Sequence, residues 1–152
     1  MEALALALEG SALGSGLRRS LVLYPAVNLV HLTGLVMLVG GIGLLDLRIL
    51  GFGRTVPLVA LSRFVTPIAI TGLLLMAASG VLMLAPDASG LIRSPLFLAK
   101  MTLVAVGVIN ALLFRRLFGH LERAPGRARL MALGSLAIWL TVAGLGRWVG
   151  YV

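Results

Sequence analysis

No cysteine occurs in this chain, and acidic residues are scarce. Without thiols the chain can form no disulfide and can hold no metal through thiolates. Only 5 Asp and Glu accompany 13 Lys and Arg among 152 residues, which makes the formal net charge +8. A catalytic triad, paired carboxylates within an apolar segment, a phosphate-binding loop and an HExxH sequence are also missing. These absences argue against hydrolytic and nucleotide-driven chemistry, and they leave other enzyme classes open.

Apolar residues dominate the composition instead. They make up 60% of the chain, and the mean hydropathy is +1.09, which is far above that of an ordinary soluble domain. A positive charge on such a chain is typical of cytoplasmic membrane loops and of contact with anionic lipid. The sequence has no basic patch interleaved with aromatic residues and no known nucleic-acid motif. We therefore expect the lipid bilayer, and not nucleic acid, as the partner.

Four apolar segments are long enough to cross a bilayer, which takes about 20 residues each. They cover approximately residues 21–46, 59–85, 95–118 and 130–150. Glycine and proline in the short stretches between them are typical helix breakers. The sequence therefore predicts a single all-α integral membrane domain over residues 1–152, a four-transmembrane-helix bundle with up-down-up-down order. At the N-terminus, Leu6, Leu13 and Leu17 share a helical face, which is typical of a short interfacial helix; a flexible tail is the alternative.

The basic residues predict the orientation. Eight of them lie around the connections between spans one and two and between spans three and four: Arg48, Arg54, Arg63, Arg115, Arg116, Arg123, Arg127 and Arg129. Five lie at the opposite ends of the spans: Arg18, Arg19, Arg93, Lys100 and Arg147. Because cytoplasmic loops carry the excess of Lys and Arg, this balance predicts that both termini lie outside the cytoplasm.

The first span carries an ordered stripe of polar side chains. Between Arg19 and Asp46 lie 26 residues without a formal charge, unless His31 is protonated. At about 100° per residue, six residues share a narrow stripe, bordered by Gly34 and Gly41. These six are Tyr24, Asn28, His31, Leu38, Ile42 and Asp46. A polar side chain facing lipid has no water to satisfy it, so we expect the stripe to face protein or a cofactor.

His31 is the strongest candidate for chemistry. It is either a metal or haem ligand or a residue that hydrogen-bonds another helix. At the same depth we expect Met76 in the second span and Lys100 in the third. A thioether beside an imidazole suits haem iron or cuprous copper, although methionines in apolar helices usually serve packing. Lys100 either reaches the headgroups or pairs with a haem propionate or an anionic substrate.

A second polar pair is predicted at the opposite membrane surface. The spacing from His31 to Asp46 is fifteen residues, as is the spacing from Lys100 to Arg115. Two helices that run the same way would thus place polar groups at matching heights. We expect Asp46 to form a structural ion pair with Arg115, or with another arginine nearby.

Three segments resemble a bacterial family of four-helix inner-membrane proteins that is catalogued as a domain of unknown function. They read YPAVNLVHLTGLVMLVGGIGLLDLRILG, SPLFLAKMTLVAVGVINALLF and GRWVGYV. The resemblance covers nearly the whole chain and implies a multi-pass protein of the bacterial inner (plasma) membrane, with periplasmic termini in the orientation above. That family often has a histidine directly after NALLF, where this chain has Arg115.

A more distant resemblance concerns His31 and Lys100, a histidine in the first span and a lysine opening the third. These positions resemble the membrane domain of copper-resistance protein D and the bacterial membrane-bound protoporphyrinogen oxidase, whose first-span histidine holds haem b. The resemblance implies a haem b protein in electron transport, with His31 as ligand and Lys100 as its polar companion. Alternatives are a copper-handling protein and a cofactor-free accessory or anchoring subunit of a membrane complex.

For haem, Gly34 would let the flat macrocycle approach the backbone. The sixth iron position would be open, filled by Met76, or supplied by His31 of a second copy in a homodimer. The redox partner would be a quinone or a membrane protein.

Overall fold

The computed structural model of the chain describes residues 2–119 and 125–149, and every regular element in these ranges is helical. The elements are α1 (Glu2–Gly10), α2 (Ala12–Arg19), α3 (Leu23–Leu50), α4 (Leu58–Leu84), the 3₁₀ turn η1 (Ala85–Asp87), α5 (Ala88–Arg93), α6 (Pro95–Phe118) and α7 (Gly126–Val149). Helices α3, α4, α6 and α7 are long and apolar enough to cross a membrane. The predicted all-α fold with four spans is confirmed.

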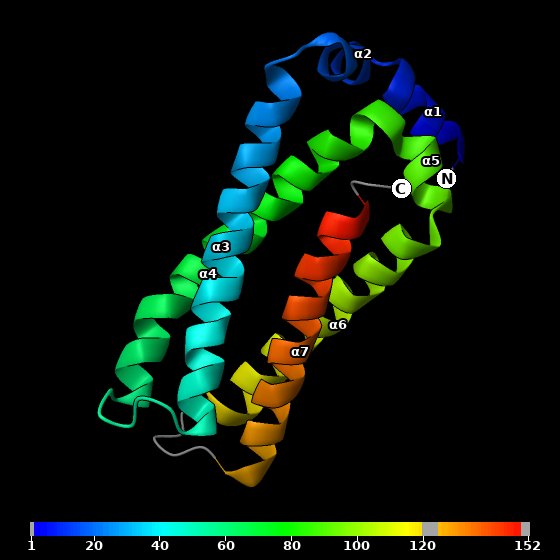
Figure 1. Cartoon of the computed structure of the whole chain (residues 1–152). Coiled ribbons are helices and arrows are strands. Elements are labelled where there is room, and N and C mark those ends of the chain that lie inside the picture. Colours follow the sequence, from blue (N-terminus) through cyan, green and yellow to red (C-terminus); the bar gives the residue numbers. More distant parts are fainter. Residues whose placement is uncertain (1, 120–124, 150–152) are drawn as a thin grey trace.

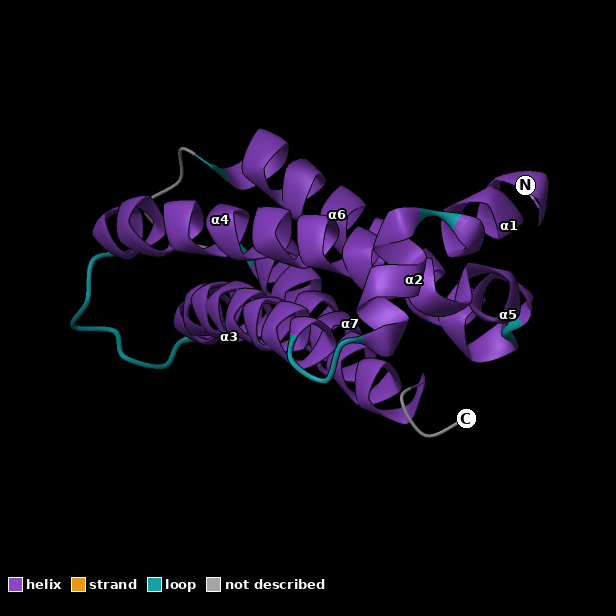
Figure 2. Cartoon of the chain, turned by 90° about the horizontal axis from the view of Figure 1, so that it is seen from above, coloured by secondary structure: helices purple, strands orange, loops and turns teal. Residues whose placement is uncertain are grey.

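The four long helices alternate in direction, and Figure 1 shows α3 and α6 running one way and α4 and α7 the other. Helix α3 packs along α4 on one side and along α7 on the other, and α7 packs against α6. Over their whole described length, α4 and α6 make at most marginal contact. Viewed from above, α3 and α4 extend together to one side of the molecule (Figure 2). The spatial order of packed neighbours is therefore α4–α3–α7–α6.

Local signals define the helix boundaries. Helix α3 ends at Gly51, whose φ of 113° lies in the left-handed region that suits glycine. In the following loop, the Arg48 side chain donates to the Val56 carbonyl at 2.6 Å. At the start of α6, the Ser94 hydroxyl accepts a hydrogen bond from the Phe97 N–H, and Pro95 occupies the first turn. The end of α3 and the start of α6 are thus satisfied by local hydrogen bonds.

Glycine lets α3 and α4 approach backbone to backbone. A methyl group at Gly72 would lie 2.6 Å from the Gly34 carbonyl oxygen and 2.6 Å from the Leu38 nitrogen. Gly41 faces α4 in the same way, with its missing methyl 3.1 Å from the Ala69 side chain. In a membrane, apolar side chains gain little by leaving lipid, because lipid is equally apolar. Helices therefore associate where small residues let their backbones pack closely. This crossing is the tightest described contact between long helices.

The predicted inward stripe of α3 is buried in its lower part. Leu38 is 2% exposed and Asp46 6% exposed, whereas Tyr24 is 39% exposed. In α7, Trp139 is 3% exposed and lies against Gly107 of α6, where a methyl group would come within 3.0 Å of the indole ring. The core is thus centred on α3 and α7.

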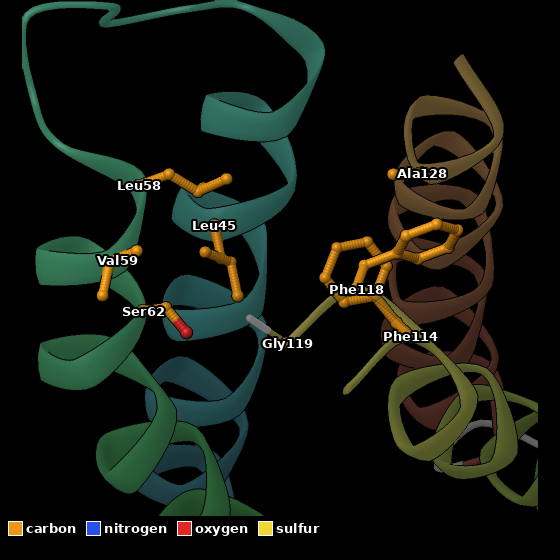
Figure 3. A pocket seen from close by; sticks show the side chains of 8 residues that line it. All are labelled: Leu45, Leu58, Val59, Ser62, Phe114, Phe118, Gly119 and Ala128. Carbon is orange, nitrogen blue, oxygen red and sulfur yellow. The ribbon is translucent and has the colours of Figure 1, made fainter. Parts of the chain in front are cut away.

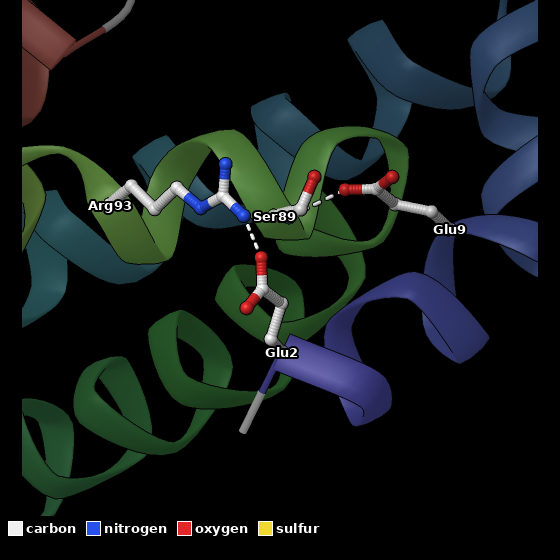
Figure 4. A network of polar contacts seen from close by, with 4 residues as sticks. All are labelled: Glu2, Glu9, Ser89 and Arg93. Atoms are coloured by element: carbon white, nitrogen blue, oxygen red, sulfur yellow. Dashed lines mark hydrogen bonds and ion pairs between the residues drawn. The ribbon is translucent and has the colours of Figure 1, made fainter.

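The N-terminal residues form two short helices that pack on the connection between α4 and α6. Glu2 pairs with Arg93, and the Glu9 carboxylate accepts a hydrogen bond from the Ser89 N–H (Figure 4). This bond, together with a further one from the Ser89 side chain, lowers the pKa of Glu9. Leu17 is 7% exposed.

The N-terminal segment predicted as an interfacial helix or a flexible tail is therefore helical and docked. The reason is that residues 85–93, most of which lie between the second and third predicted spans, form η1 and α5 and offer a surface for α1 and α2.

Candidate functional site

His31 lies on α3 and its ring is held by α4. Its Nδ1 lies 2.9 Å from the Ser79 hydroxyl oxygen. That hydroxyl in turn donates to the Leu75 carbonyl at 2.5 Å, so its oxygen is left to accept from Nδ1–H. The pair defines a tautomer in which Nε2 carries the lone pair. Ser79 is 3% exposed, which keeps this anchor out of solvent.

Lys100 of α6 and His31 of α3 both lie in the first third of helices that run the same way (Figure 1). The Lys100 amine lies beside α7, because a methyl group at Gly146 would come within 3.5 Å of Nζ. On the other side, a methyl group at Gly80 of α4 would lie 3.5 Å from His31 Cε1. All four long helices therefore contribute to this region, and two glycines line it.

Gly34 and Met76 have a different role from the one expected. A methyl group at Gly34 would lie 2.8 Å from the Gly72 carbonyl oxygen and 2.9 Å from Met76 Cγ. The prediction that Gly34 offers its backbone to a macrocycle is wrong, because α4 already occupies that space. Met76 covers Gly34 and packs against the core around Leu38. Its side chain is a packing element of the α3–α4 contact.

The expected ion pair between Asp46 and Arg115 does not form among the described residues. Asp46 is 6% exposed and hydrogen-bonds the Ser135 side chain of α7, while its Oδ2 has no partner. Arg115 is exposed on α6. Helix α3 packs against α7 and makes at most marginal contact with α6, so Asp46 is buried against α7 while Arg115 lies on the exposed surface of α6.

This geometry predicts a small effect for Asp46→Asn. Since no buried cation loses its partner, we expect the free energy of unfolding in detergent to change by less than about 1 kcal/mol. Asp46→Leu removes the Ser135 bond as well and serves as the comparison. A loss of about 3–5 kcal/mol in Asp46→Asn, measured by chemical denaturation, is the signature of a broken buried ion pair and would contradict this arrangement.

Ser79 and Ser135 are polar partners that sequence reasoning missed. A serine in an apolar helix is a weak signal, because it can bond its own helix backbone. A usable sign was the spacing, since Ser79 follows Gly72 by seven residues and shares the face that meets α3.

No group of three or more His, Asp or Glu residues is placed to hold a metal ion in the part of the chain that the structure describes. His31 is the one histidine there, since His120 lies outside the described residues. A metal or haem at His31 would therefore have a single imidazole ligand from this region of the chain.

Comparisons with known proteins identify a family but assign no activity. Neither a curated protein nor a solved structure matches the chain. A protein-family profile, described as a family of unknown function (DUF6644), matches residues 8–152. Because this match covers most of the sequence and all four long helices, the chain belongs to the family of unknown function DUF6644.

Proposed function

We propose that the chain is an integral membrane haem b-binding protein with an electron-transfer role, in which His31 is the axial ligand. The hydrogen bond between His31 Nδ1 and Ser79 carries this proposal. A ligating histidine almost always donates its other ring N–H to a neighbouring acceptor, which sets the tautomer and the ring orientation. Ser79 plays that part here and leaves Nε2 for iron.

Lys100 supports the proposal through its charge. Haem b carries propionate groups, and desolvating an anion at membrane depth costs several kcal/mol unless a cation meets it. The Lys100 amine lies beside Gly146 and within electrostatic reach of His31. It would hold a propionate near the membrane surface while His31 holds the iron deeper in the same half of the bundle.

The proposal has three versions, which differ in what occupies the sixth coordination position of the iron. Met76 is engaged with Gly34, so its thioether would have to leave the α3–α4 contact to bind iron. An open position or His31 of a second copy is therefore favoured. The bound group would carry one electron to or from a quinone or a membrane protein partner. We place the protein in the bacterial inner membrane with periplasmic termini, on the arginine balance.

A cofactor-free accessory or anchoring subunit is the second candidate. It is favoured by the same Ser79 contact, because a hydrogen-bonded histidine is a sufficient link between two helices. Copper handling has less support, since no cluster of metal-binding residues surrounds His31 in the described ranges.

Absorption spectra of variants test the proposal. The wild-type protein, expressed with ample haem and purified in detergent, should show a Soret band, and His31→Ala should lose it while still inserting into the membrane. Ser79→Ala should weaken haem binding by about tenfold to a hundredfold, as expected when the partner of a ligating histidine is removed. Lys100→Ala should lose haem faster on dilution but keep the same spectrum. His120→Ala is the matched control and should stay coloured.

Carbon monoxide separates the variants of the sixth position. An open site should bind it and shift the Soret band, whereas a site with two histidines should be low-spin and resist it. A wild-type protein that purifies colourless from haem-supplemented cells would exclude the haem function. Copper retained by wild type and lost in His31→Ala would then support copper handling, and no metal in either would support the accessory subunit.

A further inference from the structure

A hollow lies at the end of the bundle opposite to His31. It is a shallow, open hollow, and the empty space in and immediately around it, open surroundings included, is about 390 Å³. Figure 3 shows it between the α3–α4 pair and the α6–α7 pair. Its lining is apolar apart from one hydroxyl and comprises Leu45, Leu58, Val59, Ser62, Phe114, Phe118, Gly119 and Ala128.

The hollow exists because two helices that face it do not pack together. The first turns of α4 and the last turns of α6 line it, and these helices make at most marginal contact. Phe114 and Phe118 form its wall on α6, with ring centroids 5.5 Å apart. In a bilayer an apolar gap of this kind is filled by whatever the surroundings supply, and at this depth the surroundings are lipid chains.

Arginines flank the residues that line the hollow. Arg63 follows Ser62 on α4, and Arg115 and Arg116 lie between Phe114 and Phe118 on α6. Two more stand on either side of Ala128 on α7, namely Arg127 and Arg129. All five are exposed, and their side chains make no hydrogen bond or ion pair with the described residues.

No acidic group in the surrounding helices offsets this charge. Asp46 is the one acid within the four long helices, and it is buried. Two other arginines at this end are occupied in the α3–α4 loop, where Arg48 donates to Val56 and Arg54 donates to Gly51. Five exposed arginines, here called the rim arginines, thus stand next in sequence to the lining of an apolar recess, and within the four long helices no exposed acid accompanies them.

We propose that this hollow binds an anionic phospholipid, with one acyl chain between α4 and α6 and the phosphate headgroup among the rim arginines. Basic pockets between membrane helices bind anionic headgroups in this way. Each arginine near the membrane surface adds about the same amount to the electrostatic binding energy. The bound chain would close the gap that the protein leaves between its two helix pairs. The site is independent of His31 and of any haem.

Lipid retention by the full-length protein tests the proposal. The detergent-purified chain is titrated with phosphatidylglycerol or with phosphatidylcholine of identical acyl chains, and bound lipid is counted by native mass spectrometry. Phosphatidylglycerol should bind saturably, at one molecule per chain, and tighter than phosphatidylcholine. Arg63→Gln should weaken phosphatidylglycerol binding by about fivefold, whereas Arg19→Gln at the other end of the bundle should leave it unchanged.

Two further arms identify which part of the lipid is held. Ser62→Leu, which fills the hollow, should reduce binding of the whole lipid; Val59→Phe is the second filling variant if that protein is unstable. Glycerophosphoglycerol, the headgroup without chains, should fail to compete. Equal binding of both lipids, unaffected by Arg63→Gln, would mean nonspecific annular lipid and overturn the proposal. Effective competition by the free headgroup would mean a phosphate site and would overturn it as well.

Discussion

Replacing Gly72 by alanine is expected to lower the free energy of unfolding by about 2–3 kcal/mol, the cost of overpacking a tight contact. The added methyl group would meet backbone atoms at 2.6 Å, the Gly34 carbonyl oxygen and the Leu38 nitrogen. Backbone cannot rotate away as a flexible side chain can, so α3 and α4 must separate. Gly72→Leu should have a larger effect for the same reason.

Gly40 on the same pair of helices provides the matched control, because a methyl group there has nothing within 4 Å. Gly40→Ala should be neutral or stabilise the helix by up to about 1 kcal/mol. Unfolding by heat or by titration with SDS measures both variants. Equal stability of the two alanine variants would show that the helices do not cross at Gly34 and Gly72.

The Gly72 variants also bear on the proposed function. Ser79 follows Gly72 by two helical turns and bonds His31 across the same contact. If the helices separate, this bond should lengthen, and haem binding in Gly72→Leu should fall together with stability. Haem lost in a variant of unchanged stability would place the effect at the iron and not at the crossing.

Truncating Trp139 to alanine is the second change with a large expected effect, a loss of about 3 kcal/mol in the free energy of unfolding. Its indole is 3% exposed and fills the contact between α7 and Gly107 of α6. Lipid outside the protein is as apolar as the core, so the loss comes mainly from the unfilled cavity and the missing packing contacts.

Trp148 near the end of α7 serves as the control, because it lies on the opposite side of the helix from Trp139 and is 66% exposed. Trp148→Ala should change the free energy of unfolding by less than about 0.5 kcal/mol. Trp139→Phe keeps an aromatic ring against Gly107 and removes an N–H that has no described partner. It should be nearly as stable as wild type. A severe loss in Trp139→Phe, seen by thermal unfolding, would mean that the indole N–H has an acceptor and that polarity, not volume, holds this contact.

Some parts of the candidate site were predictable from residue spacing and others were not. His31 and Lys100 were expected at one depth, and the structure places Lys100 within electrostatic reach of the histidine. Spacing along a helix determines depth because the rise per residue is constant. The expected pair between Asp46 and Arg115 does not form among the described residues, because spacing along a helix does not say which helices are neighbours.

The N-terminal helices show the same limit. The apolar spacing of this segment was evident in the sequence, but of the predicted face Leu17 is buried while Leu6 and Leu13 are exposed. The docking of these helices depends on α5, which lies between the second and third predicted spans, and on the pairing of Glu2 with Arg93. Contacts between residues so far apart in the chain leave no local pattern that a periodicity could reveal.

The class of protein, the number of spans and the inward face of the first span follow from the sequence alone. These properties depend on length, hydropathy and helical period, which are local. Three features depend on how the helices pack: α4 packs on Gly34, Ser79 bonds His31, and Asp46 bonds Ser135 of α7 while Arg115 stays exposed. In a bilayer, apolar faces are nearly interchangeable, so the choice of neighbour depends on close contacts at small residues and on a few polar bonds.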